Sequence, residues 1–469
     1  MSKQKRKKQF YLLSLGCSKN TVDSESMAAL LQRAGYRGAD DKDEAGILIV
    51  NTCGFIQSAK EESLSALREL AATKKPDQLL IAAGCLSQRY GPMLVQEVPQ
   101  LDGVIGTRRW MDIVPFVHQL RRRKHPEPLY HLPGDAETVG RDERNVLRAA
   151  RQGASAYLKI ADGCRRPCAF CTIPEIKGTL VSRPVQSIVE EAVRLQDAGV
   201  RELIIISQDS TDYGHDLGLK NGLSHLLERV VAAAPGIDWI RIMYAYPGYV
   251  TDELIATMAE TPQILPYLDI PLQHAHRETL KRMRRPANVD WVYRTVDKLR
   301  KAMPDLAIRT TFIVGYPGET DEEFAALLDF VRDMRFDRVG AFTYSYEAST
   351  PSATVSWQVP DEVKAQRVEE LMALQQRISL EKNQEQVGRT LPVLIEGYSE
   401  EDDVSVGRSY RDAPEIDGYV FVPGRLPEGE IVPVTIDGAM TYDLTGVPAG
   451  YQAGNTLITL DAVNTAAER

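Results

Sequence analysis

The sequence has no long apolar run. None of its 469 positions begins a stretch of eighteen consecutive apolar residues, which argues against a membrane-spanning helix. The basic residues 1–8 are not followed by an apolar signal core or a small-residue cleavage site, so we do not expect secretion. With 43% hydrophobic and 26% charged residues, the composition is that of an ordinary globular protein, and we expect a cytoplasmic one.

Cysteine is also scarce. The chain has six cysteines and none beyond position 171. Because we expect no oxidising compartment, disulfide bonds are not expected either. Six thiols in a reducing environment favour metal ligation or catalysis instead. The cysteines form two groups of three, which are Cys17, Cys53 and Cys85, and Cys164, Cys168 and Cys171.

The second cysteine group is closely spaced. Cys164, Cys168 and Cys171 follow the pattern Cys-x3-Cys-x2-Cys, and no fourth cysteine or histidine lies in this loop. Three thiolates hold three corners of a 4Fe–4S cube and leave the fourth iron open to another ligand. An open iron predicts a reaction site. A structural zinc site, which would want a fourth ligand, and a plain electron-transfer cluster remain as alternatives.

The first cysteine group follows three apolar, strand-like runs. The runs are 10–15, 47–50 and 79–83, with helical patterns at 23–34 and 58–72 between them. This alternation predicts a parallel sheet, whose ligand sites lie beyond the carboxyl ends of its strands. We therefore expect Cys17, Cys53 and Cys85 to meet in space. The alternative is three separate buried thiols, but the flanking Gly16, Gly54 and Gly84 favour loop tips.

The middle of the chain alternates strand-like and helical segments. Residues 121–124 and 126–151 have the charge and Pro/Gly content of a linker. Strands are expected at 156–160, 202–207, 239–244, 267–270, 308–314 and 338–344, and helices at 185–198, 223–233, 252–260, 291–303, 321–334 and 361–380. Six such units predict a partial (β/α)6 barrel, with the second cysteine group in the loop after its first strand, on the face where barrels keep their active sites.

Polar residues also follow other strands of this predicted barrel. Ser207, Gln208 and Asp209 end the second strand, Gln273 follows the fourth and Gly315 the fifth. Their shared face makes them candidates for contacts to a cofactor. Helix capping and turn formation are the alternative roles for such residues.

The last part of the chain is short-stranded and acidic. Strands at 391–397, 404–409, 418–422, 431–436 and 443–447 predict a small OB-like β-barrel. Residues 383–469 contain fifteen acidic and five basic residues and no lysine, whereas the whole chain carries a net charge of −9. The acidity is therefore concentrated here. We predict three domains, at 9–145, 146–382 and 383–469.

The second cysteine group, with the aromatic Phe170 before its last member, resembles the cluster loop of the radical S-adenosylmethionine (SAM) enzymes. The resemblance implies that the open iron chelates the amino and carboxylate groups of SAM. It further implies that one electron from the cluster cleaves a carbon–sulfur bond of SAM. The product is a 5′-deoxyadenosyl radical, which abstracts hydrogen from an unactivated carbon. Phe170, Ser207, Gln208, Asp209, Gln273 and Gly315 are the candidate cofactor-binding residues.

The first group resembles the methylthiotransferase domain, and the acidic C-terminal part occupies the position of that family's TRAM domain. The motifs are Gly16-Cys17-Ser18-Lys19-Asn20 with Asp23-Ser24-Glu25, Asn51-Thr52-Cys53-Gly54-Phe55 and Ala83-Gly84-Cys85. The resemblance covers nearly the whole chain and implies a second 4Fe–4S cluster, held by Cys17, Cys53 and Cys85. It also implies a transferase that uses two SAM molecules, one donating a methyl group to sulfur and one generating the radical. A low-potential donor such as flavodoxin or ferredoxin is expected to reduce the clusters.

Two substrate classes fit this family. One branch modifies a tRNA adenosine, and the other modifies the β-carbon of an aspartate in the twelfth small-subunit ribosomal protein. An acidic module repels RNA phosphates but attracts a basic ribosomal protein, so we favour the second and expect the turn at Glu400, Glu401, Asp402 and Asp403 to dock it. An iron–sulfur redox sensor without turnover, and a methylase that transfers no sulfur, remain as alternatives.

Overall fold

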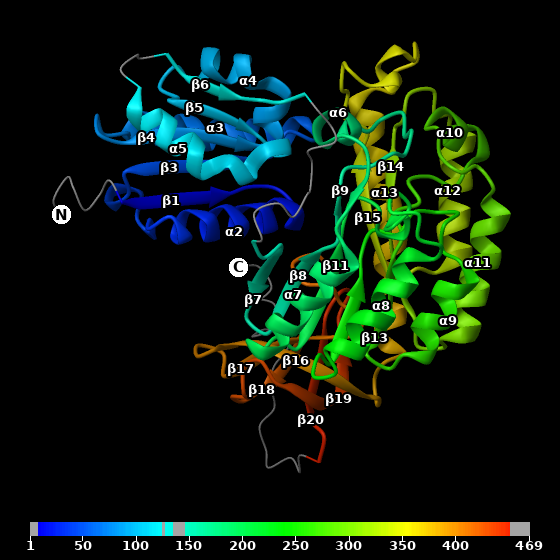
Figure 1. Cartoon of the computed structure of the whole chain (residues 1–469). Coiled ribbons are helices and arrows are strands. Elements are labelled where there is room, and N and C mark those ends of the chain that lie inside the picture. Colours follow the sequence, from blue (N-terminus) through cyan, green and yellow to red (C-terminus); the bar gives the residue numbers. More distant parts are fainter. Residues whose placement is uncertain (1–7, 124–126, 135–145, 451–469) are drawn as a thin grey trace.

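The computed structural model describes residues 8–123, 127–134 and 146–450, which form three units (Figure 1). The first unit (β1 to β6) lies at the upper left of Figure 1, the second unit (β7 to α13) at the right, and the β-barrel module (β16 to β20) below the second. None of the described helices is long and apolar enough to cross a membrane.

The first unit is a parallel sheet in the order β2-β1-β3-β4-β5-β6. Its strands are β1 (Gln9–Ser14), β2 (Arg37–Gly38), β3 (Ile47–Thr52), β4 (Leu79–Gly84), β5 (Gly103–Gly106) and β6 (Leu129–His131), and its helices are α2 (Ser18–Arg33), α3 (Gln57–Thr73), α4 (Cys85–Glu97) and α5 (Ile113–Arg122).

Both faces of this first sheet are buried. In β3, Ile47 and Ile49 pack in one core with residues of α2 and α5. Leu48 and Val50 point the other way, into a second core with residues of α3 and α4. A strand covered on both faces needs an uninterrupted apolar run, which is why 47–50 could be recognised from the sequence.

The second unit is a seven-stranded open sheet in the order β15-β14-β13-β12-β11-β8-β7. Its strands are β7 (Ala149–Gln152), β8 (Ser155–Lys159), β11 (Glu202–Ile206), β12 (Trp239–Ile242), β13 (Ile264–Asp269), β14 (Ala307–Val314) and β15 (Arg338–Thr343). The six expected strands run parallel, and β7 is added antiparallel to β8. A two-stranded ribbon of β9 (Ala161–Asp162) and β10 (Val181–Ser182) leads out of β8.

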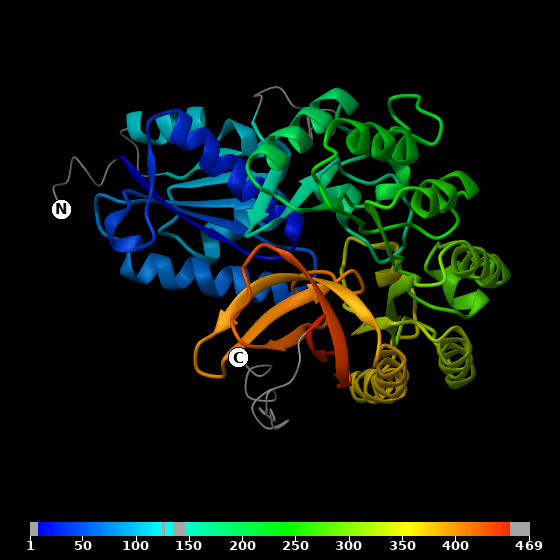
Figure 2. The ribbon, with the colours of Figure 1, turned by 90° about the horizontal axis from the view of Figure 1, so that it is seen from below.

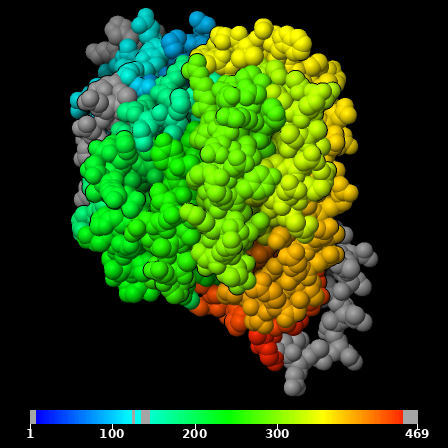
Figure 3. Space-filling model, turned by 90° about the vertical axis from the view of Figure 1, so that its right-hand side faces the viewer, coloured from blue at the N-terminus to red at the C-terminus, as the bar shows by residue number. Residues whose placement is uncertain are grey.

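Helices cover the outer face of this sheet (Figure 1). They are α7 (Val185–Asp197), α8 (Gly222–Ala233), α9 (Asp252–Glu260), α11 (Val289–Ala302), α12 (Asp321–Met334) and α13 (Asp361–Gln384). The second unit also has two short helices outside this core, α6 (Ile173–Lys177) and α10 (Arg277–Arg282). Residues of the second unit, coloured green to yellow, make up most of the side of the molecule that Figure 3 shows. In β11, Leu203 and Ile205 face the helix-covered core, while Ile204 and Ile206 face a core shared with the β-barrel module. The module therefore packs against the inner face of the sheet (Figure 2).

The β-barrel module closes on itself in the order β16-β17-β18-β20-β19. Its strands are β16 (Thr390–Ser399), β17 (Val404–Ser409), β18 (Val420–Pro423), β19 (Ile431–Ala439) and β20 (Leu444–Pro448). The predicted fold class, a parallel α/β sheet followed by a partial barrel and a small five-stranded barrel, is confirmed. Residues 451–469 of the predicted third domain lie outside the described residues.

The expectation of a linker at 121–124 and 126–151 was wrong in part. α5 continues to Arg122, β6 adds Leu129–His131 to the first sheet, and β7 adds Ala149–Gln152 to the second. Strands of three or four residues at a sheet edge carry too little alternation to be recognised from the sequence. Residues 124–126 and 135–145 of the expected linker lie outside the described residues.

Candidate functional site

All six cysteines line one cavity of about 490 Å³ between the first and second units. Each sheet contributes one group from loops at the carboxyl ends of its strands, as parallel sheets do at their ligand sites. The two cysteine groups, separated by seventy-nine positions in the sequence at their closest, thus face a common space.

The first group is held by tight loops after β1, β3 and β4. Cys17 precedes α2, Cys53 follows β3, and Cys85 is the first residue of α4. A Cβ atom at Gly16 would come within 2.7 Å of the Cys53 Cβ atom, and Gly16 has a φ of +90°, so only glycine fits this approach. These three thiols therefore lie side by side because the backbone here is glycine.

Asn20 ties these loops together. Its Nδ2 donates to the carbonyl oxygens of Leu15 at 3.0 Å and Thr52 at 3.1 Å. Its Oδ1 accepts from the Cys85 thiol at 3.5 Å. One buried amide thus fixes the ends of three strands, and this explains its place in the Gly16–Asn20 motif.

The thiols of the first group differ in acidity. Burial raises the pKa of Cys85 to about 12 and also raises that of Cys53. Cys17 is exposed to the cavity. Burial among protein groups opposes its ionisation too, but the charges of Lys19 and Lys177 and a backbone N–H of Asn20 outweigh this and lower its pKa. Cys17 is therefore the most readily ionised thiol of this group.

The second group lies in the loop between β9 and α6. The backbone N–H of Arg166 donates to the Cys164 sulfur at 3.4 Å, and that of Ile173 donates to the Cys171 sulfur at 3.5 Å. The Arg285 guanidinium lies 3.5 Å from the Cys168 sulfur. Donors aimed at all three sulfurs are what thiolate ligands of an iron–sulfur cluster need around them.

Burial also dominates the acidity of two thiols of the second group, Cys164 and Cys171. It raises the pKa of Cys164 to about 11 and that of Cys171 to about 12. Without a metal these thiols are protonated at neutral pH, so binding iron must displace their protons. The loop itself is anchored by a backbone bond from Ala169 to the carbonyl oxygen of Met283 at 2.9 Å.

The thiols fit a cluster better than a single ion. Across the part of the chain that the structure describes, no three His, Cys, Asp or Glu side chains are arranged to hold one metal ion. In a cubane each thiolate binds a different iron corner, so the three sulfurs surround a space instead of converging on a point. Six thiols that line one cavity, with N–H donors aimed at Cys164 and Cys171 of the second group, are compatible with that arrangement.

The candidate cofactor residues divide into two sets. Phe170, Gln208 and Gln273 line the cysteine cavity. Ser207 is fully buried against Ser210, and Asp209 accepts from the Arg166 guanidinium at 2.6 Å. Arg166 itself lines the cavity, so Asp209 orients a cavity residue without lining the cavity itself.

Gly315 is absent from the cavity lining and has a different structural role. Its φ is +67°, and a Cβ atom there would meet the Lys364 side chain at 2.2 Å. The turn after β14 thus needs glycine because the side chain of α13 packs on it. Contact of Ser207, Asp209 and Gly315 with a cofactor stays a prediction.

A buried ionic network joins the first and second units below the cavity. Asp23 of α2 pairs with Lys159 of β8 and, at 3.1 Å, with Lys177 of α6. Asp162 pairs with both lysines at 3.0 and 3.2 Å and with Arg148. Burial alone would raise the pKa of Asp162, but these three cations outweigh burial and hold the pKa well below its usual range. The network fixes the two cysteine groups relative to each other.

Sequence reasoning missed several charged residues of the cavity. Lys19 lies over the Tyr244 ring at 3.0 Å from its centroid, and Lys177, Arg285 and Arg309 also line the cavity. One signal was available in β8, where Lys159 interrupts an apolar strand and must find a buried partner. The partner, Asp23, lies 136 positions earlier, so the sequence could not name it.

Carboxylates of the β-barrel module have two uses. Asp412 pairs with Arg338 at 2.7 Å, and Glu430 pairs with Arg201 at 2.8 Å, so part of the module's acidity docks it to the second unit. The acidic turn (Glu400–Asp403) between β16 and β17 lies apart from these pairs. Its Glu400, Glu401 and Asp403 are exposed, and Asp403 accepts from the Tyr398 hydroxyl at 2.6 Å.

Comparison with protein families divides the chain in the same way. Residues 9–106 match "Uncharacterized protein family UPF0004", residues 158–331 match "Radical SAM superfamily", and residues 387–448 match "TRAM domain".

Curated relatives match over nearly their full length. A ribosomal protein uS12 methylthiotransferase RimO from Chloroflexus aurantiacus is 50% identical over 451 residues, covering 93% of this chain and 99% of the relative. Proteins of the same name from Roseiflexus sp. and Thermoanaerobacter sp. are 46% and 45% identical, and cover 93% of this chain and 96% and 98% of their own lengths.

A solved structure shares the fold at low identity. The radical S-adenosylmethionine methyltransferase TsrM from Kitasatospora setae, with cobalamin and a [4Fe-4S] cluster bound, matches with a TM-score of 0.56 at 15% identity. The match covers 74% of this chain and 77% of that one.

Proposed function

The chain belongs to the family of ribosomal protein uS12 methylthiotransferases, and from this premise we propose that it adds a methylthio group to the β-carbon of an aspartate of uS12. It is a radical SAM enzyme, so it uses SAM and an iron–sulfur cluster. The observation that carries the proposal is the pair of three-cysteine groups, from two different units, around one cavity.

We assign one 4Fe–4S cluster to each cysteine group. Cys17, Cys53 and Cys85 would hold one, and Cys164, Cys168 and Cys171 the other. When bound, the clusters and SAM supply the low-potential electron, the hydrogen-abstracting radical and the sulfur group of the reaction. The shared cavity supports this division because a carbon activated at one group lies within the same space as sulfur held at the other.

The protein's own side chains prepare this cavity. Phe170, Ile173 and Ile176 give it an apolar wall, which excludes water and strengthens electrostatic interactions inside. Lys19 and Lys177 bring positive charge beside Cys17, and would stabilise the negative charge of a thiolate-ligated group. Gln208 and Gln273 are polar side chains at strand ends and are the candidates to orient SAM, together with the aromatic Phe170.

The substrate choice is supported by charge as well as by family. The exposed acidic turn (Glu400–Asp403) suits a basic ribosomal protein and would repel RNA phosphates. A cytoplasmic location follows from a ribosomal substrate. A flavodoxin or ferredoxin fits the need for a low-potential electron donor.

The test is anaerobic reconstitution of the full chain with iron and sulfide, followed by incubation with SAM, dithionite and either uS12 or tRNA. Mass spectrometry should find a methylthio group on an aspartate of uS12 and none on tRNA. Methylthiolated adenosine instead would replace the proposed substrate. Absence of SAM cleavage by the reduced protein would favour the redox-sensor alternative.

A further inference from the structure

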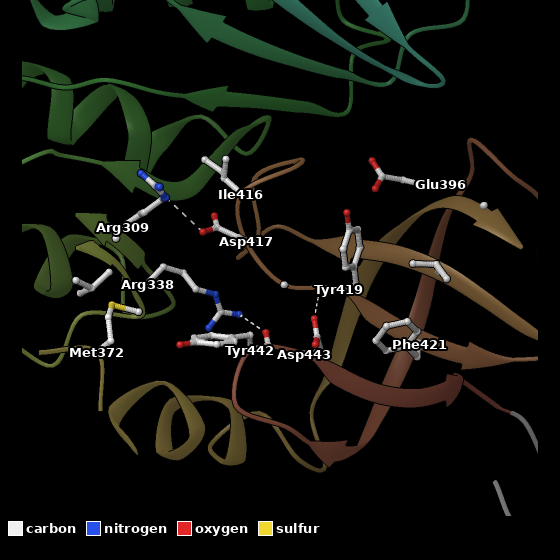
Figure 4. A pocket seen from close by; sticks show the side chains of 15 residues that line it. Arg309, Arg338, Met372, Glu396, Ile416, Asp417, Tyr419, Phe421, Tyr442 and Asp443 are labelled. Atoms are coloured by element: carbon white, nitrogen blue, oxygen red, sulfur yellow. Dashed lines mark hydrogen bonds and ion pairs between the residues drawn. The ribbon is translucent and has the colours of Figure 1, made fainter. Parts of the chain in front are cut away.

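A second cavity of about 880 Å³ lies between β15 and the β-barrel module (Figure 4). The second unit contributes Arg309, Gly340 and Met372 to its wall, and the module contributes residues around Glu396 and Tyr419. We call it the β15 groove. No part of the mechanism described above uses it.

The β15 groove meets the cysteine cavity at two residues. Arg309 and Ile416 line both spaces, so the two cavities adjoin at these side chains. Arg309 is held in place there by Asp269 at 2.9 Å and Asp417 at 3.4 Å. The boundary between the two cavities is therefore formed by a side chain that two carboxylates hold in place.

One wall of the groove is an edge strand. β15 is the terminal strand of its sheet and, among the described strands, pairs with β14 alone. Arg338, Val339 and Gly340 of this strand line the groove, and exposure rises toward the strand's carboxyl end, where Phe342 is 54% exposed and lines the cysteine cavity. Tyr346, just beyond the strand, is 57% exposed. Exposed edges with large apolar side chains are surfaces on which other chains dock.

The opposite wall offers carboxylates to a cation, while the two arginines that line the groove, Arg309 and Arg338, are paired with Asp417 and Asp412. Glu396 takes both of its hydrogen bonds from Arg408 on one oxygen, Oε1, and Asp443 accepts the Tyr419 N–H on Oδ1. Within the described residues, the second oxygen of each carboxylate takes no hydrogen bond. In Figure 4 the Tyr419 ring lies between Glu396 and Asp443, whereas the Tyr442 ring lies beside Arg338. Aromatic faces beside carboxylates bind lysine and arginine side chains.

We propose that the β15 groove receives an extended, lysine- or arginine-bearing segment of the substrate protein and leads its aspartate past Arg309 and Ile416 to the cysteine cavity. The proposal rests on the proposed function. It adds that recognition occurs between β15 and the module, so the docked module forms one wall of the substrate path.

The test places a positive charge inside the groove. Met372, on α13, lines the groove but not the cysteine cavity. In the reconstituted full chain, Met372→Arg should weaken binding of uS12 by about tenfold or more, because the new guanidinium would repel the cations of the substrate. A tenfold loss of affinity corresponds to roughly 1.4 kcal/mol of binding free energy. Met372→Leu, which fills the same volume without charge, should bind as the wild type does. Both variants should cleave SAM at the wild-type rate without uS12, which shows that they are folded and loaded.

A crosslinking measurement does not depend on a destabilising change. A photoreactive phenylalanine analogue at Met372 should crosslink to uS12, whereas the same probe at Glu428, which lines a different cavity of the module, should not. If Met372→Arg binds uS12 with wild-type affinity, or if only the probe at Glu428 crosslinks, the groove does not bind the substrate. Either result is compatible with modification of uS12 by the wild-type enzyme. If the wild-type enzyme fails to modify uS12, the proposed function is wrong, and so is the proposal that the groove binds this substrate.

Discussion

Replacing Asp23 by Asn should loosen the joint between the first and second units. Asp23 lies on α2, and its partners Lys159 and Lys177 belong to β8 and α6, with every side chain of the cluster at most 4% exposed. The change removes one of the two carboxylates that this network sets against Lys159, Lys177 and Arg148, and leaves Asp162 as the other. Removing one partner of a buried ion pair costs roughly 3–5 kcal/mol, because the remaining charge has lost its compensation. That range lowers the ratio of docked to undocked protein by about two to four powers of ten.

Two assays follow this perturbation. Urea denaturation should show a free energy of unfolding lower by about 3–5 kcal/mol for Asp23→Asn. The exposed Asp297→Asn, which removes a surface pair with Lys301, should change it by less than about 1 kcal/mol. If SAM cleavage needs only the second cysteine group, as we propose, it should survive at temperatures where the variant stays folded. Methylthio transfer needs both groups in register and should fall.

The reasoning would be refuted by an Asp23→Asn variant whose unfolding free energy lies within about 1 kcal/mol of the wild type. Equal loss of SAM cleavage and methylthio transfer, with iron content unchanged, would also contradict it. The network would then be a local feature of α2 and would not align the two cysteine groups.

Three further predictions concern separate parts of the molecule. Cys53→Ala should leave SAM cleavage largely intact and stop methylthiolation, whereas Cys168→Ala should stop both; loss of SAM cleavage in Cys53→Ala with the second cluster still loaded would contradict the division of labour. Reversing the acidic turn (Glu400–Asp403) to lysines should weaken uS12 binding most strongly at low salt, since exposed charges are screened within about 10 Å at 0.1 M salt; affinity equal to wild type would show that the turn does not dock the substrate. Glu202 is buried between Arg408 and Arg241; burial opposes its ionisation, but the two arginines outweigh this and lower its pKa from 4.5 to about 2. Its stabilisation of the module should therefore be complete above pH 4.5 and be lost as the pH falls toward about 2. The melting temperature of Glu202→Gln should then fall less than that of the wild type over this pH range. An equal fall in both proteins would show that other groups cause the loss of stability in acid.

The six parallel strands of the second unit, and β1, β3 and β4 of the first, were predictable because their signal is local. β14 spans Ala307–Val314 against an expectation of 308–314, and α9 and α12 have the expected bounds. The meeting of Cys17, Cys53 and Cys85 at one cavity likewise follows from parallel strands that share a carboxyl edge.

What could not be predicted depends on contacts between distant parts of the chain. The pairing of Asp23 with Lys177 joins residues 154 positions apart, and no local pattern specifies it. The charge of the module was read as a free acidic surface, but Asp412 and Glu430 are used to dock the module onto arginines of the second unit. Composition counts charges without saying which of them are already paired.

The central claim is that each cysteine group of this chain holds its own 4Fe–4S cluster beside a shared cavity. Iron and sulfide analysis of oxygen-free reconstituted protein, combined with Mössbauer spectroscopy, tests it most directly. The wild type should contain about eight iron atoms per chain, and the variant with Cys17, Cys53 and Cys85 all changed to Ala should contain about four, since each cube holds four. About four iron atoms in the wild type, unaltered in that triple variant, would contradict the claim.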